Sequence, residues 1–184
     1  MQVVRGRGEF ASPRSIAVET AEGRRTIAFE HCIIAAGSSV ARIPGFPYDD
    51  PRIIKSTGAL ALATVPKRML VVGGGIIGLE MATVYDALGA KITVVELMDS
   101  LIPGADTDIV KVLHKRIEKR YEKILLRTKV SRMEAKKEGI SVTFEGPAGQ
   151  ITDTFDCILM AVGRRPNGRD IKAELAGVTV NERG

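Results

Sequence analysis

Several residue types that mark particular functions are rare or absent in this sequence of 184 residues. It has no tryptophan and only 4% aromatic residues, so it lacks the stacking platforms on which many proteins bind nucleic acid. No apolar run reaches the roughly 18 residues that a membrane-spanning helix needs. Residues 1–5 lack the apolar core of a signal peptide, so a cytoplasmic location is the default expectation. We therefore expect neither a nucleic-acid nor a membrane partner.

Cysteine and histidine are equally scarce. The two cysteines, Cys32 and Cys157, are far apart in the sequence, which excludes a Cys-x-x-Cys redox motif. Two histidines cannot complete a zinc site with them at these spacings, and we expect no bound metal. Each cysteine precedes a short apolar segment typical of a buried strand, so we expect two reduced core cysteines.

Basic residues exceed acidic ones, giving a formal net charge of +5. Much of the excess lies in residues 111–123, where apolar residues recur at helical spacing and leave the charges on the opposite face. The expected apolar stripe consists of Val112, Leu113, Ile117, Tyr121 and Ile124. A solvated helix face is the favoured interpretation, and a nucleic-acid surface is the alternative.

One stretch, residues 69–80, carries the clearest functional pattern. Four apolar residues suited to a buried strand run into Gly73-x-Gly75-x-x-Gly78, and an apolar helical segment follows to about residue 88. In such a loop Gly73 allows a tight turn, Gly75 lets a pyrophosphate approach, and Gly78 lets the helix pack closely on the strand. The helix N-terminus offers free N–H groups and partial positive charge to phosphates.

The segments after this loop complete a β-α-β-α-β unit. Gly89 ends the first helix, residues 91–96 form a strand, and Asp106 or Thr107 begins a basic helix that runs to about residue 123. Residues 124–126 form the third strand. From Val130 the pattern becomes antiparallel, with arms at 140–144 and 151–155, before a last strand at 156–163. This order predicts an α/β, Rossmann-like parallel sheet with an antiparallel β-meander.

The segment before the loop reads as β-structure followed by a connection. We expect a short strand at residues 3–4, a turn at 5–8, hairpin arms at 16–20 and 25–29, and a buried strand at 32–38. Residues 39–66 contain several prolines and read as connective, with Ser56 or Thr57 capping a short helix to about residue 63.

The two ends of the chain have similar sequence patterns. Residues 16–37 and 140–163 both run from a hairpin through a cysteine-headed apolar strand to a glycine, but only the second copy follows a β-α-β-α-β unit. We therefore expect that the chain begins partway through a first dinucleotide-binding domain. Two unrelated hairpins that look alike are the alternative.

Glu96 ends the second strand of the glycine-loop unit, 23 positions after Gly73. An acid at this place can accept hydrogen bonds from the adenosine ribose, and its charge would repel a 2′-phosphate. It therefore favours NAD over NADP. The alternative is a surface acid at a strand end.

Other candidate residues stay ambiguous from spacing alone. Glu80 lies within an apolar helical run, where a carboxylate needs either water or a cation, and a solvated position is favoured. Arg164 and Arg165 can neutralise phosphates or lie in a surface turn. His31 and His114 have no partners typical of a catalytic triad.

Together these motifs resemble the pyridine nucleotide–disulfide oxidoreductases. The resemblance covers the whole chain and rests on residues 71–80, 94–96, 33–38 and 161–167. It implies an FAD-domain segment at 1–38, a connector at 39–65, an NAD-binding domain at 66–163, and a return toward the FAD domain at 164–184.

The resemblance also implies site residues. The positions that correspond to NAD contacts are Gly73, Gly74, Gly75, Ile76, Ile77, Gly78, Leu79, Glu80, Glu96, Val130 and Gly163. Flavin-side positions are Gly8, Ala36, Gly37 and Ser38. In the family, the acid at the position of Glu80 pairs with a lysine beside the flavin, which implies a supporting role for this residue.

Within the family, the chain is most similar to members that oxidise dihydrolipoamide through a disulfide and FAD and reduce NAD+. The resemblance implies a homodimeric parent that works with the lipoamide-bearing acyltransferase of a 2-oxo acid dehydrogenase complex. The family's redox cysteine pair, FAD glycine motif and His-Glu base have no counterpart in these 184 residues, so we expect no catalytic residue here and no activity from this chain alone. A glutathione- or mercuric-reductase-like enzyme and a non-catalytic NAD-binding module are the alternatives.

Overall fold

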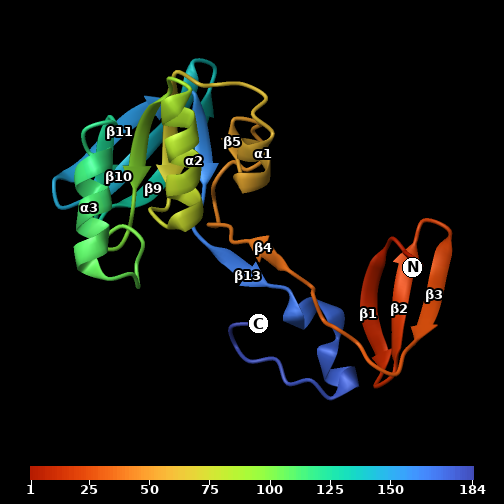
Figure 1. Ribbon diagram of the computed structural model, residues 1–184. Helices are drawn as coiled ribbons and strands as arrows, with labels where there is room; N and C mark the ends of the chain where they lie inside the picture. Colours follow the sequence, from red (N-terminus) through yellow and green to blue (C-terminus); the bar gives the residue numbers. More distant parts are fainter. The chain divides into compact units, whose positions relative to one another are not determined.

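Apolar strands on either side of the glycine loop form the parallel sheet that the sequence predicts. The computed structural model describes residues 1–184 and divides into a larger unit, Val40–Gly163, and a smaller unit made of Met1–Ser39 and Arg164–Gly184. The sheet of the larger unit has the order β5-β12-β6-β7-β8, all parallel. Figure 1 labels its edge strand β5. Its strands are β5 (Ile53–Ile54), β6 (Arg68–Val72), β7 (Lys91–Val95), β8 (Lys123–Leu125) and β12 (Cys157–Met160).

Three helices belong to the larger unit: α1 (Ser56–Leu60), α2 (Ile76–Ala87) and α3 (Thr107–Ile117). As predicted, α2 begins after the glycine loop and ends before Gly89, whose φ of 98° only glycine adopts readily. The expected side-chain cap of α1 is wrong, because Lys55 is the N-cap residue and makes no side-chain bond. None of the helices is both long and apolar enough to cross a membrane.

Helix α3 ends earlier than the sequence predicts. Its last residue is Ile117, whereas helical periodicity suggested an end near residue 123. The backbone N–H of Glu122 donates to the carbonyl of Ile92 at 2.7 Å, so the chain has already turned into the sheet at this point. Pairing of β8 with β7 therefore overrides the local helical pattern.

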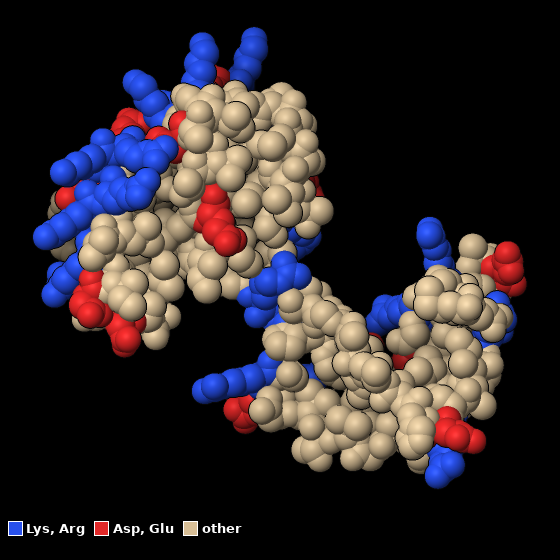
Figure 2. Space-filling view, viewed as in Figure 1, with Lys and Arg blue, Asp and Glu red and all other residues tan.

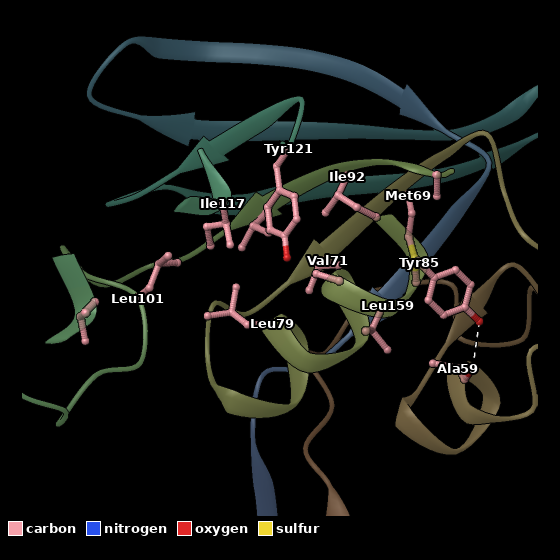
Figure 3. Packing of buried hydrophobic residues seen from close by; sticks show 14 residues of the cluster. Ala59, Met69, Val71, Leu79, Tyr85, Ile92, Leu101, Ile117, Tyr121 and Leu159 are labelled. Carbon is pink, nitrogen blue, oxygen red and sulfur yellow. Dashed lines mark hydrogen bonds between the residues drawn. The ribbon is translucent and has the colours of Figure 1, made fainter. Parts of the chain in front are cut away.

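The sheet is buried on both faces, and its strands alternate between two cores. One core lies between the sheet and the helices, and Figure 3 shows Leu79 of α2 and Ile117 of α3 within it. The other lies against the antiparallel meander. From β6, Met69 and Val71 enter the first core and Leu70 and Val72 the second. This two-sided burial explains why the strands read as continuous apolar runs.

Tyr85 ties α1 to α2 within the helix-side core. Its side chain is 2% exposed, and its hydroxyl donates to the carbonyl of Ala59 at 2.9 Å (Figure 3). The phenol therefore contributes apolar area while its one polar group is satisfied.

The inward face of α3 differs from the predicted stripe at one position. Val112 is 71% exposed, and Val110 is buried in its place beside Ile117. The outward face carries basic residues, and Figure 2 shows Lys and Arg gathered along the edge of the larger unit where α3 lies. This agrees with the predicted solvated face.

The meander that covers the other face consists of β9 (Lys129–Lys136), β10 (Gly139–Gly146) and β11 (Gly149–Phe155). Its strands are antiparallel, with β10 between β9 and β11, as the sequence predicts. Phe144 and Phe155 pack edge to face with ring centroids 6.2 Å apart. These rings close the second core.

Arg68, the first residue of β6, joins the parallel sheet to the meander. Its guanidinium donates to both oxygens of Asp153 at 2.9 and 3.0 Å, and to both oxygens of Glu122 at 2.8 and 3.2 Å. It also donates to the Thr154 carbonyl at 2.7 Å and lies 5.1 Å from the centre of the Phe155 ring. This paired, partly buried arginine links three segments that are distant in sequence.

The smaller unit contains a second antiparallel meander, formed by β1 (Arg7–Ser12), β2 (Ser15–Thr20) and β3 (Gly23–Ala28). The predicted hairpin arms are confirmed, but the strand expected at residues 3–4 is wrong, because regular pairing begins only at Arg7. The remaining elements are β4 (Ser38–Val40), which pairs with β13 (Arg164–Pro166), and two 3₁₀ turns, η1 (Gly168–Ile171) and η2 (Ala173–Ala176).

The strand predicted at residues 32–38 is also wrong over most of its length. Residues 32–37 have no regular structure, Ile33 is 94% exposed, and Cys32 is exposed rather than buried. The matching segment β12 forms a strand because β5 and β6 flank it, and no parallel strand flanks residues 32–37. An apolar segment needs lateral partners for its backbone groups before it becomes a strand.

Cys157 behaves as predicted. It is a free, partly buried cysteine at the start of β12. Burial first, and then the charge of Asp156, raises the pKa of its thiol to about 11. The thiol is therefore protonated and unreactive at neutral pH.

Replacing Arg68 with Met is expected to lower the free energy of unfolding by about 1–3 kcal/mol at pH 7, because two carboxylates lose their bidentate partner. Chemical denaturation measures this change. Arg132→Met is the matched control, since Arg132 and its partner Glu134 are exposed, and it should change stability by less than about 0.5 kcal/mol.

The difference in the free energy of unfolding between wild type and Arg68→Met should also depend on pH. The Arg68 guanidinium holds the pKa of Asp153 well below its usual range, against the opposing effect of burial. A depressed pKa stabilises the fold above the ordinary carboxyl pKa of about 4, and this contribution is lost as the pH falls through the folded value. The gap between wild type and Arg68→Met should therefore shrink below about pH 4, and a gap that widens there would contradict this account.

Candidate dinucleotide-binding site

The three glycines of the motif lie where β6 turns into α2 and have different surroundings, with Gly73 and Gly75 before the helix and Gly78 in its first turn. Gly73 has a φ of 108°, and a Cβ atom there would overlap the carbonyl of Ala161. A Cβ atom on Gly78 would overlap the carbonyl of Gly73 and press against Val71 of β6. These two glycines therefore make the turn and allow the close helix–strand packing that the motif predicts.

Gly75 is different, because a Cβ atom there would meet nothing within 4 Å. The residue is the N-cap of α2, it has extended backbone angles, and no side chain caps the helix. The first turn contains no acidic residue. The N-terminus of α2 thus presents uncapped N–H groups and partial positive charge beside open space, which suits an approaching phosphate.

Glu96 follows β7 and is buried, with 9% of its surface exposed. One carboxylate oxygen accepts a hydrogen bond from the Gly74 N–H at 2.7 Å, and the other accepts from the Met98 N–H at 2.8 Å. The alternative of a surface acid is therefore wrong. A carboxylate has about four acceptor positions, so two remain for a ligand's hydroxyl groups.

A cleft of about 560 Å³ opens at the carboxyl ends of the parallel strands. In open α/β sheets this is the edge at which ligands bind. The predicted residues Gly73, Gly75, Glu96, Val130 and Gly163 lie along it. It is also lined by Ile43, Val72, Val95, Leu97, Met98, Pro103, Thr128, Lys129, Ala161 and Val162.

Leu97 and Met98 are cleft residues that the sequence reasoning missed. They are 65% and 51% exposed, which is unusual for large apolar side chains and leaves an apolar surface beside Glu96. The signal that could have found them is their position directly after the acid. Exposed apolar residues one and two positions beyond a predicted ribose ligand suggest a surface for a flat base.

Other predicted NAD positions lie around the loop rather than in the cleft. Gly74 packs beneath Leu101 and Glu96, and Leu79 is buried in the helix-side core. Ile76 is 64% exposed, and Ile77 is half-buried. These residues shape the loop, and direct contact with a nucleotide stays a prediction for each of them.

Glu80 is exposed on the second turn of α2 and has no cation within ion-pair distance in this chain. This agrees with the solvated position that spacing favoured. Support of a flavin by Glu80 stays a prediction.

The flavin-side positions belong to the smaller unit. Gly8 and Ala36 line a shallow hollow of about 200 Å³ together with apolar residues. Asn167 fastens the neighbouring backbone, since its N–H donates to the Gly37 carbonyl and its amide group to the Ala36 carbonyl, each at 3.0 Å. The small residues at 35–37 leave this backbone uncovered, as a close ligand contact requires.

The two arginines after β12 have protein partners. Arg164 donates to the hydroxyl of Ser38 at 2.7 Å and also to its carbonyl, and Arg165 forms an ion pair with Asp170 at 2.7 Å. Both therefore have partners within the smaller unit, and a role with phosphates stays a prediction.

The parallel sheet, the glycine loop and the acid after β7 define an α/β fold of the Rossmann-like, doubly wound class. The sequence pattern described as "Pyridine nucleotide-disulphide oxidoreductase" matches residues 1–184, and the chain belongs to this family. The resemblance seen in the sequence is thereby confirmed.

Among curated relatives, the chain is 49% identical over 185 residues to the dihydrolipoyl dehydrogenase of Vibrio cholerae, covering 100% of this chain and 39% of that protein. It is 48% identical over 183 residues to the dihydrolipoyl dehydrogenase of Haemophilus influenzae, covering 99% of this chain and 38% of the relative. The chain thus spans about two fifths of the length of these relatives.

Solved structures agree with this assignment. The HOCl-induced flavoprotein disulfide reductase RclA from Escherichia coli matches with a TM-score of 0.84 at 29% identity, over 100% of this chain and 41% of that one. LpdA from Mycobacterium tuberculosis also matches with a TM-score of 0.84, at 26% identity, over 99% of this chain and 40% of that one.

Two glycine substitutions should separate the binding surface from the packing. Gly75→Ala should leave the fold within about 1 kcal/mol of wild type, because the new methyl group meets only open space. If the pyrophosphate approaches through that space, as the motif predicts, the same change should weaken NADH binding roughly tenfold or more. Gly78→Ala should instead lower the free energy of unfolding by about 1–3 kcal/mol through overlap with the Gly73 carbonyl.

Thermal unfolding and calorimetric titration measure the two effects on the same protein samples. Gly149→Ala is the control for binding, since Gly149 lies at the β10–β11 turn, outside the cleft lining. Its φ of 87° disfavours alanine, so this variant should lose stability but keep the NADH affinity of wild type. Equal NADH affinity for Gly75→Ala and wild type would exclude Gly75 from the phosphate site.

Proposed function

We propose that the cleft at the carboxyl edge of the parallel sheet binds the adenosine diphosphate half of NAD(H). The observation that carries this proposal is the arrangement of Gly75 and Glu96 at one cleft. Gly75 leaves room for a pyrophosphate at the N-terminus of α2, and Glu96 offers a carboxylate at the end of the adjacent strand. Leu97 and Met98 supply an apolar surface on which the adenine can rest.

The charge of the cleft favours NAD over NADP. Glu96 is the acid that lines it, and its negative charge repels a 2′-phosphate while accepting hydrogen bonds from free ribose hydroxyls. Lys129 also lines the cleft, but its ammonium is paired with Glu145 at 2.8 Å. A bidentate arginine of the kind that holds a 2′-phosphate is not among the lining residues.

For the whole enzyme we propose the reaction of a dihydrolipoyl dehydrogenase, because the relatives with nearly half of their aligned residues identical carry this name. Two thiols of dihydrolipoamide are oxidised to a disulfide, and the two electrons pass through FAD to NAD+ as a hydride, with release of a proton. The residues described here hold the nucleotide that receives the hydride. The flavin-side positions Gly8, Ala36, Gly37 and Ser38, and support of the flavin by Glu80, belong to the same proposal.

The proposed partners follow from the proposed reaction. They are NAD(H), the dihydrolipoamide-bearing acyltransferase of a 2-oxo acid dehydrogenase complex, and a second copy of the whole enzyme. A cytoplasmic location remains part of the proposal. A related disulfide reductase is the second candidate, because the fold is similar to that of a flavoprotein disulfide reductase at 29% identity. The disulfide substrate that the whole enzyme accepts distinguishes the two candidates.

Nucleotide choice is directly measurable. Titration of the chain with NADH and NADPH should show clear preference for NADH. Glu96→Ala should weaken NADH binding by roughly 1–3 kcal/mol, the range for hydrogen bonds to a charged group. Equal binding of the two nucleotides, or an unchanged NADH affinity in Glu96→Ala, would contradict the proposed ribose contact.

The 184-residue chain alone should show no lipoamide turnover in an assay of NADH formation from dihydrolipoamide and NAD+. Its two cysteines are not spaced as a redox pair, and the raised pKa of Cys157 keeps that thiol protonated at neutral pH. A yellow purified protein that turns over dihydrolipoamide would refute this expectation. The same preparation should still bind NADH, which separates loss of catalysis from loss of folding.

A further inference from the structure

Glu96 makes four hydrogen bonds to four residues of the larger unit. Its carboxylate accepts from the N–H groups of Gly74 and Met98. Its own backbone N–H donates to the Leu125 carbonyl at 2.8 Å, and its carbonyl accepts from the Thr128 N–H at 3.0 Å. One residue thus connects the glycine loop, the segment after β7 and the segment after β8.

These three segments form three walls of the proposed nucleotide cleft, and the segment after β12 forms another. Gly73 and Gly75 come from the first, Leu97 and Met98 from the second, and residues 128–130 from the third. Two further backbone hydrogen bonds join the same segments. The N–H of Ile102 donates to the Gly74 carbonyl, and the N–H of Arg127 donates to the Met98 carbonyl, each at 2.9 Å. The hydrogen bonds of Glu96, Ile102 and Arg127 therefore hold these three segments together around Glu96.

The two residues that donate these further hydrogen bonds, Ile102 and Arg127, have unusual backbone angles. Ile102 and Arg127 have φ values of 45° and 50°, in the left-handed region. This region is disfavoured for residues with a Cβ atom, and strongly so for β-branched isoleucine. Such conformations persist where surrounding bonds over-determine them, and here those bonds converge on the segments that Glu96 joins.

We propose that Glu96 is a positioning residue that joins the walls of the cleft through the N–H groups of Gly74 and Met98, in addition to its proposed contact with the ribose. The inference rests on the proposed nucleotide site. It predicts that Glu96 contributes to binding even when the ligand has no ribose hydroxyl groups to offer. A carboxylate is required because both of its oxygens accept from backbone N–H groups at once.

The discriminating substitution is Glu96→Gln. Glutamine has nearly the same shape but only one acceptor oxygen, and its amide nitrogen cannot accept from an N–H group. One of the two backbone donors, on Gly74 or on Met98, must therefore lose its partner. Glu138→Gln is the matched control, because Glu138 is exposed in the β9–β10 turn and lies outside the cleft lining.

The binding experiment compares two probes, ADP and 2′,3′-dideoxy-ADP, by calorimetric titration of the 184-residue chain. The dideoxy probe keeps the adenine and pyrophosphate but lacks both ribose hydroxyl groups. A positioning role predicts that Glu96→Gln loses roughly tenfold in affinity for both probes, corresponding to the loss of one charge-assisted hydrogen bond. If Glu96→Gln binds dideoxy-ADP as tightly as wild type and loses affinity only for ADP, Glu96 acts through the ribose alone and the proposal is overturned.

A second measurement needs no ligand, and its decisive part needs only the wild-type chain. In the nucleotide-free wild type, the amide protons of Gly74 and Met98 should exchange slowly and resonate downfield, as charge-assisted hydrogen bonds require. In Glu96→Gln at least one of the two signals should move upfield, and both should be unchanged in Glu138→Gln. Rapid exchange of both amides in the wild type would overturn the positioning role.

The two proposals can fail separately. If wild type binds neither ADP nor dideoxy-ADP, the proposed nucleotide site is wrong. Protection of the two amides would then still support assembly of these segments by Glu96, and its absence would overturn that role as well.

Discussion

Burial of the parallel sheet on both faces is the constraint on which the rest of this structure depends. Each central strand sends alternate side chains into a helix-side core and a meander-side core, so neither layer can move without exposing apolar surface. The two layers hold the strands in register, and their carboxyl ends meet at one edge. The cleft lies at that edge because the loops that follow the strands leave the sheet there.

At this edge the chemistry is supplied mainly by the backbone. Gly73 and Gly78 allow α2 to start close to β6, and Gly75 leaves its N-terminus uncovered. Glu96 is the charged side chain that organises this backbone, through the N–H groups of Gly74 and Met98. A site of this kind depends on small residues and on one buried acid, so its specificity resides in few positions.

The amino-terminal edge of the sheet depends on a different interaction. Arg68 joins β6 to the meander and to the segment before β8 through paired carboxylates. Glu96 and Arg68 thus stand at opposite ends of adjacent strands and perform a similar task with opposite charge. Glu96 joins the walls of a cleft, whereas Arg68 joins the parallel sheet to the meander. The two ends differ in the open space beside Gly75.

The sequence by itself determined the β-α-β-α-β succession of the parallel unit and the packing roles of Gly73 and Gly78, and it singled out the acid at position 96. These depend on local patterns, since strand hydrophobicity, glycine spacing and an acid at a strand end can be read in short windows. Only the tertiary structure decided that Val112 faces solvent, that α3 stops at Ile117, and that residues 32–37 do not form a strand. Each of these outcomes depends on hydrogen-bond or packing partners from distant parts of the chain, which a local pattern cannot contain. The same holds for the carboxylate of Glu96, because the Gly74 N–H that it binds is 22 residues away.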